Sequence, residues 1–147
     1  MQQIISSTTI FLSLLTSINA VSVRLELQLD SAPQETSWEV RGPLPRPTLI
    51  GGVTFDYYSE PSIQVIEVFD LEEGQYLFLL NDFENNGINN GSFKIIAELI
   101  EGPKVLAEGS GAFGSGQISE FTVPEDQPVQ VEVSRDGGYF RGSLSSR

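Results

Sequence analysis

Strict alternation of apolar and polar residues in one early segment limits the fold more than any other feature. Val21, Val23, Leu25, Leu27 and Leu29 occupy every second position, with polar residues between them. A period of two places all five side chains on one face of a β-strand. The segment therefore predicts a half-buried strand whose aliphatic side chains face a core.

Further strand-like runs follow along the chain, and turn signals separate them at intervals of about ten residues. The run Tyr76–Leu80 is apolar on both faces, which is typical of a central strand. Residues 43–47 contain three prolines, which lack the N–H donor that a central ladder needs. The other expected strands are Thr36–Val40, Thr48–Phe55, Ile63–Phe69, Phe93–Leu99, Val105–Leu106, Ile118–Val123 and Val129–Val133. We therefore expect an all-β fold, a single antiparallel β-sandwich of jelly-roll-like or Greek-key type.

The first 20 residues carry no charged side chain, and Ile10–Ile18 is an apolar run of the length found in secretory signal peptides. The small side chain of Ala20 suits the position before a cleavage site, so we expect cleavage between Ala20 and Val21. The alternative is an uncleaved membrane anchor, for which the apolar run is short and is diluted by Ser and Thr. The mature protein is predicted to be secreted, with no membrane span.

The sequence predicts three parts. Residues 1–20 form the signal peptide, and residues 21–133 form the β-sandwich domain. Residues 134–147 are rich in Gly and Ser and contain three arginines and one aspartate, so we expect a flexible, weakly basic tail.

The composition excludes several kinds of chemistry. Twenty acidic and eight basic residues give a net charge of −12, which disfavours binding to nucleic acid. The chain contains no His and no Cys, so it has no Ser-His-Asp triad, no thiol nucleophile, no imidazole or thiolate zinc site and no disulfide. We therefore expect a non-enzymatic protein. The alternative is an extracellular polysaccharide hydrolase that uses a pair of carboxylates.

The segment that begins at Asp82 is the candidate metal site. Asp82, Glu84 and Asn86 present oxygen-bearing side chains at alternate positions before Gly87, as short calcium-binding loops do. Phe93 stands where an EF-hand loop has its final Glu, so an EF-hand is excluded. The alternative is a polar turn in which the Asp and Asn side chains cap their own backbone. Ca²⁺ is the one cofactor that the sequence suggests.

Four aromatic residues are candidates for stacking on a sugar ring, namely Trp38, Tyr57, Tyr58 and Tyr139. The alternative for Trp38 is a place in the core, because it shares a strand face with Val40. Adjacent residues of an extended segment point in opposite directions, so one of Tyr57 and Tyr58 is expected to be exposed. Asn90 begins the chain's N-glycosylation sequon, which matters if the source is eukaryotic.

Residues 109–114 have the spacing G-x-G-x-x-G. A dinucleotide-binding loop with this spacing is followed by a helix, whereas here a strand-like run follows. The segment is therefore predicted to be a flexible hairpin loop.

Several segments resemble, in the same order, a secreted β-sandwich module that is common in extracellular proteins of marine bacteria and microalgae. Residues 81–93 are similar to its Asp-Ser-x-Gly-Asp-Gly-Ile loop, and residues 72–78 to the strand that approaches this loop. Residues 34–39 match its Glu-Thr-Ser-Trp element, and residues 106–114 look like its closing strands. The resemblance covers roughly residues 23–123.

The chain departs from the module at identifiable positions. The module often has Cys at the positions of Asp70, Gln75, Asn89 and Asn90, and all four are absent here, as in a disulfide-free variant. The module has no established catalytic role, so the resemblance implies an accessory domain for binding or cell adhesion. We therefore expect a binding or adhesion module, aided by Ca²⁺, that recognises an extracellular glycan or a cell-surface protein.

Overall fold

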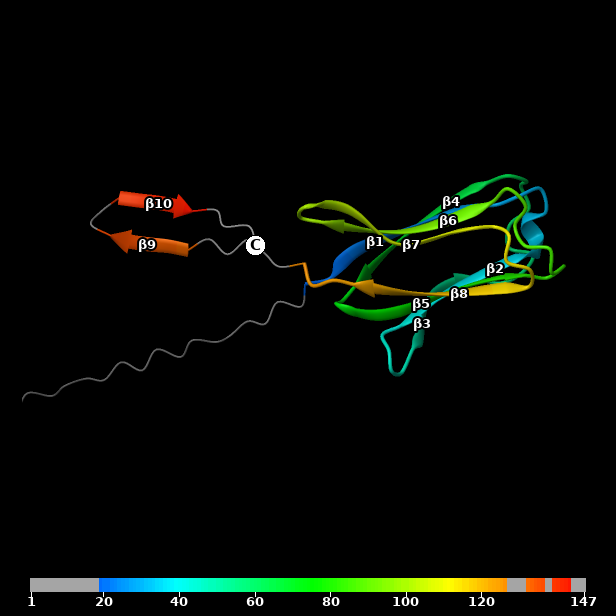
Figure 1. Ribbon diagram of the computed structural model, residues 1–147, viewed down its shortest axis with the longest axis horizontal. Coiled ribbons are helices and arrows are strands. Elements are labelled where there is room, and N and C mark those ends of the chain that lie inside the picture. Colours follow the sequence, from blue (N-terminus) through cyan, green and yellow to red (C-terminus); the bar gives the residue numbers. More distant parts are fainter. Residues whose placement is uncertain (1–18, 127–131, 137–138, 144–147) are drawn as a thin grey trace, which may run out of the picture.

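The computed structural model describes residues 19–126, 132–136 and 139–143 (Figure 1). Eight strands form two four-stranded antiparallel sheets that pack face to face. The described residues contain no α-helix, and therefore none long and apolar enough to cross a membrane. The all-β sandwich predicted from the sequence is confirmed.

The two sheets contain four strands each. In the first sheet the order is β4-β1-β6-β7, with β1 at Val21–Gln28, β4 at Gln64–Leu71, β6 at Ser92–Leu99 and β7 at Gly102–Ser110. In the second sheet the order is β3-β2-β5-β8, with β2 at Thr36–Gly42, β3 at Thr48–Val53, β5 at Gly74–Asp82 and β8 at Gly116–Val123.

Most connections of the sandwich cross from one sheet to the other. Within it, only β2–β3 and β6–β7 are hairpins of consecutive strands, whereas β1 pairs with β4 and β2 pairs with β5. These are Greek-key connections. Because the direction of the chain reverses at each step, the loops that follow β1, β3, β5 and β7 meet at one end (right in Figure 1). We call these loops, residues 29–35, 54–63, 83–91 and 111–115, the loop tip.

The core contains the aliphatic face of β1 and the aromatic side chains that meet it. The five alternating residues from Val21 to Leu29 are all at most 2% exposed, as the period of two predicts. Phe78 of β5 and Phe93 of β6 lie on opposite sheets with ring centroids 4.9 Å apart, and Trp38 lies 6.5 Å from Phe78. These large side chains fill the space between the sheets without any disulfide.

Several strand predictions are confirmed with shifted ends, and β7 is longer than expected. The apolar pair Val105–Leu106 signals only the middle of β7, because Pro103, Lys104 and Glu108 hide the rest of its pattern. The segment 109–114 joins the two sheets rather than forming a hairpin, since β7 and β8 belong to different sheets.

A separate two-stranded sheet follows the sandwich. It pairs β9, Glu132–Asp136, with β10, Tyr139–Ser143. In this part of the chain the sequence predicts a strand at Val129–Val133 and a flexible tail at residues 134–147. Residues 127–131, 137–138 and 144–147 lie outside the described residues. Because a lone hairpin is marginally stable in water, the eight strands of the sandwich must provide the stability of the fold.

Candidate functional site

The four loops of the loop tip are joined to one another by backbone hydrogen bonds. Asp56 N donates to Gln34 O at 2.8 Å, and Phe83 N donates to Glu35 O at 2.9 Å. Residues 34–35 thus hold the loop after β3 on one side and the loop after β5 on the other. The side chains that project from the tip are therefore carried on an anchored backbone.

Asp82 organises the loop that follows β5. Its side chain is only 4% exposed, and its Oδ2 accepts hydrogen bonds from Asn86 N at 2.7 Å and from Gly87 N at 2.9 Å. Gly87 has a φ of +73°, and a Cβ there would overlap the carbonyl oxygen of Gly111. This is the polar turn that the sequence offers as the alternative to a metal loop.

Asp30 has the same kind of role on the neighbouring loop. Its Oδ1 accepts a hydrogen bond from Ala32 N and its Oδ2 accepts one from Asn89 N, both at 2.9 Å. The second contact joins the loop after β1 to the loop after β5. Carboxylates that accept hydrogen bonds from backbone amides stabilise loops in this way.

Ile88 anchors the centre of the loop tip, a role that the sequence reasoning missed. It is 1% exposed, although polar residues surround it in the sequence. Its backbone N–H donates to Gly111 O, and its carbonyl oxygen accepts from Gly91 N. A single aliphatic residue directly after a glycine in a polar loop is the signal that could have indicated this anchor.

The three predicted calcium ligands have different surroundings. Asp82 is buried with Oδ2 bound to two amides, whereas Glu84 is exposed to solvent. Asn86 is exposed, and its side chain opposes the rise in the pKa of Glu35. Within residues 19–126 no three acidic side chains lie close enough together to hold a metal ion. Calcium binding by this loop stays a prediction.

Thermal unfolding tests the calcium prediction. A cation that binds only the folded protein raises the melting temperature, by several degrees at about a hundredfold excess over Kd. The control is NaCl at the same ionic strength, because general screening also stabilises an acidic protein. A rise specific to Ca²⁺ that Asp82→Ala abolishes supports the site, and equal melting in the two salts removes Ca²⁺ from the interpretation.

The candidate sugar-stacking residues are distributed between the core and the surface. Trp38 and Tyr58 are buried, and Trp38 Nε1 donates a hydrogen bond to the Tyr58 hydroxyl at 3.0 Å. Burial raises the pKa of Tyr58 above its usual value. Tyr57 is 65% exposed and packs edge-on against Tyr58, with ring centroids 4.9 Å apart. Of these three residues, only Tyr57 exposes its ring to solvent. The side chain of the fourth candidate, Tyr139, lies outside the part of the chain whose side chains are described.

Two further aromatic side chains are exposed at the loop tip and were missed from the sequence. Phe83 is 68% exposed and Phe55 is 38% exposed, and their rings meet edge-on with centroids 5.7 Å apart. They come from different loops, so the sequence offers no signal that they pair. Asn90 of the sequon is also exposed at this end.

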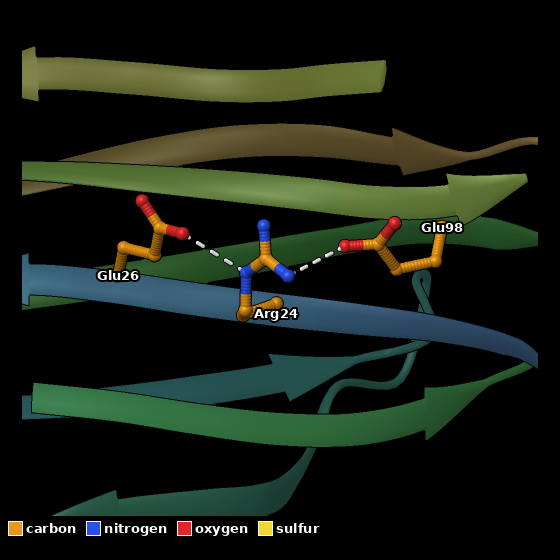
Figure 2. A network of polar contacts seen from close by, with 3 residues as sticks. All are labelled: Arg24, Glu26 and Glu98. Atoms are coloured by element: carbon orange, nitrogen blue, oxygen red, sulfur yellow. Dashed lines mark hydrogen bonds and ion pairs between the residues drawn. The ribbon is translucent and has the colours of Figure 1, made fainter. Parts of the chain in front are cut away.

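The loop tip is an acidic end of the sandwich, and its loops carry no positive charge that compensates the carboxylates. Its four loops contain no Lys and no Arg. Its carboxylates are Asp30, Glu35, Asp56, Glu60 and Glu84 on the loops and Asp82 at the end of β5. In the described residues the ion pairs lie on the sheet faces instead. Arg24 lies between Glu26 and Glu98 (Figure 2), Arg41 pairs with Glu39, and Lys94 pairs with Glu108.

Glu35 shows the electrostatic effect of this arrangement. Desolvation, followed by the repulsion of Glu84, Asp82 and Asp30, raises the pKa of Glu35, and the side chain of Asn86 opposes this rise. A carboxyl whose pKa is higher in the folded state favours folding while it is protonated and loses that contribution as the pH rises through the folded pKa. A bound cation would offset the repulsion at neutral pH.

A shallow groove of about 410 Å³ lies away from the loop tip, between the edges of β7 and β8. Its lining includes the charged side chains of Lys104 and Glu120 and the apolar side chains of Val105 and Phe121. None of the residues that the sequence singles out as site candidates lines this groove.

No family model, curated protein or solved structure matches this chain. The resemblance of residues 81–93 to the secreted module therefore stays a prediction.

Proposed function

We propose that this protein is a secreted, non-enzymatic binding module whose contact surface is the loop tip. The observation that carries the proposal is the exposed pair Phe55–Phe83 on loops whose backbone is anchored. Large apolar side chains held at the surface of a folded domain are typical of interaction sites, and loops on a rigid scaffold usually carry them. Tyr57 adds a third exposed ring on the loop that contains Phe55.

The partner belongs to the extracellular glycans or cell-surface proteins. Aromatic rings offer apolar faces to sugars and to side chains alike, and the surrounding carboxylates and amides accept or donate hydrogen bonds. Asp30 and Asp82 are engaged with backbone amides, so they support the surface rather than form it.

A panel of immobilised polysaccharides and proteins tests this proposal. We expect the wild-type protein to be retained on at least one member, and we expect Phe83→Ala to weaken that retention by about tenfold, as loss of a central aromatic contact does. Val68→Ala on β4 is the matched control, since Val68 is an apolar residue that is 60% exposed outside the loop tip. Equal retention of the two variants would contradict the assignment of the surface.

A polysaccharide hydrolase is the second candidate, and one observation favours it. Glu35 has a raised pKa and lies in the field of Glu84, as an acid catalyst beside a second carboxylate does. Glu35→Gln distinguishes the two functions, because it removes turnover from a hydrolase, whereas a non-enzymatic binding module has no turnover to lose. Release of reducing sugar from polysaccharides by the wild-type protein, lost in Glu35→Gln, would replace the binding proposal.

Secretion is part of the proposal and has its own prediction. The first strand begins at Val21, which is buried and pairs with Leu71, so the sandwich starts directly after the expected cleavage site. Mass spectrometry of the exported protein should give a chain that begins at Val21. A chain that begins at Met1 and needs detergent for extraction would show an uncleaved anchor instead.

A further inference from the structure

We propose that the loop tip binds an arginine-bearing or lysine-bearing segment of a polypeptide, with the Phe55–Phe83 pair in contact with the cationic side chain. The inference rests on the proposed function and names the chemistry of the partner. Two independent features support it, namely the exposed rings and the distribution of charge.

The rings present the surface that a planar cation favours. Phe55 and Phe83 meet at an interplanar angle of 69°, so the edge of one ring contacts the other and leaves ring faces open. A cation over an aromatic face is attracted by the negative charge density of that face. The guanidinium of arginine is flat and weakly hydrated, so it can stack on such a ring and still form hydrogen bonds at its edge.

Carboxylates are carried by the same loops as the two rings. Asp56 directly follows Phe55, and Glu84 directly follows Phe83. The segment that ends at Glu35 lies between them, because its carbonyl groups accept the backbone N–H groups of Asp56 and Phe83. Each ring therefore has an acidic residue next to it in the sequence, and the backbone of Glu35 lies between the two loops. In residues 19–126 no ion pair neutralises these three carboxylates.

The same features argue against other ligands at this position. A hard metal ion needs several oxygens at one point and makes no use of aromatic rings, and the described residues contain no cluster of three acidic side chains that could hold one. An acidic glycan or a nucleic acid would be repelled by the tip. A neutral sugar could stack on the rings but would leave the carboxylates uncompensated. A cationic polypeptide uses both features.

Synthetic peptides provide the probe. The experiment measures binding of a short, fluorescently labelled Arg-Gly-Ser peptide to the full exported protein by anisotropy, at low salt and at physiological salt. The matched peptide has citrulline in place of arginine, which keeps the shape and removes the charge. We expect the arginine peptide to bind, its affinity to fall with salt, and the citrulline peptide not to bind.

Four variants localise the binding. Phe83→Ala and Glu84→Gln should each raise Kd by about tenfold, because they remove the ring and its acidic neighbour. Val68→Ala and Glu108→Gln remove an exposed apolar residue and an exposed acid outside the loop tip, and they should leave Kd within about twofold. Equal effects of all four variants would show diffuse attraction to an acidic protein and would overturn the proposal.

The remaining outcomes separate this inference from the proposed function. If Phe83→Ala weakens retention on a polysaccharide while the arginine peptide fails to bind, the tip is a binding surface and its partner is not cationic. If Phe83→Ala leaves retention unchanged and the arginine peptide does not bind, both proposals are wrong. The chain itself carries three arginines in residues 134–147. Replacing them by glutamine tests whether a second copy of this chain is the cationic partner. Self-association that is lost both in this variant and in Phe83→Ala would support the inference.

Discussion

Replacing Phe78 by alanine is expected to lower the free energy of unfolding by about 3–5 kcal/mol. The side chain is 0% exposed, and it lies in the middle of β5, between Trp38 of the same sheet and Phe93 of the opposite sheet. Its removal would leave a cavity where the two sheets meet. The protein has no disulfide to limit the loss, and a change of this size is a large part of the stability of a single domain.

Urea unfolding measures this change, and Phe83→Ala is the matched control. The same substitution at a residue that is 68% exposed should change the free energy of unfolding by no more than about 0.5 kcal/mol. If Phe78→Ala were as stable as Phe83→Ala, then Phe78 would not lie in the core, and the alternation that places Tyr76, Phe78 and Leu80 between the sheets would be wrong.

The fold was predictable where burial leaves a periodic pattern. In β1 one face lies on the core and the other on solvent, so the chain alternates from Val21 to Leu29. In β5 the outward-facing Leu77 and Leu79 are also apolar and half-buried, and the continuous run correctly predicted a central strand. The free energy of moving a side chain out of water determines both patterns. This free energy depends on the type of residue and not on which distant residues it contacts.

The strand order was not predictable, because it depends on which strands pair. β1 alternates in the same way whether its neighbours are β4 and β6 or any other two strands. Only the middle of β7 was predictable, because edge strands tolerate proline and charged residues, such as Pro103 and Lys104, that weaken a strand pattern. The sequence therefore defined the elements and the number of layers but not their arrangement.

The loop tip shows why the site was harder to predict than the fold. Asp82 and Gly87, which the sequence analysis singles out, form a hydrogen bond that stabilises the backbone of the loop tip. Asp30 has the same role on the neighbouring loop. The exposed Phe55 and Phe83 look like ordinary apolar residues until the structure places them outside the core and beside each other. A pattern of turn residues predicts the geometry of the backbone. The kind of ligand depends instead on the side chains that this backbone exposes.

Gly111→Ala is expected to destabilise the protein by about 3 kcal/mol, at the upper end of the cost of overpacking a well-packed site. A Cβ at this position would overlap the carbonyl oxygen of Ile88. Backbone hydrogen bonds prevent the two segments from moving apart, because Ile88 N donates to Gly111 O and Gly111 N donates to Gly91 O, both at 2.9 Å. Accommodating the methyl group would break these bonds and lift Ile88 out of the core.

Gly114→Ala, on the same loop, is the control that separates crowding from backbone strain. Gly114 has a φ of +70°, and no atom lies within 4 Å of an added Cβ. Alanine there should therefore lower the free energy of unfolding only by the cost of the left-handed backbone conformation, about 1 kcal/mol. Urea unfolding of the two variants should therefore differ by about 2 kcal/mol, the difference between the two costs. NMR should show shifted signals at Ile88 in Gly111→Ala alone. If the two variants are equally stable, Gly111 does not touch Ile88, and the loop tip lacks the rigid anchor on which the binding surface depends.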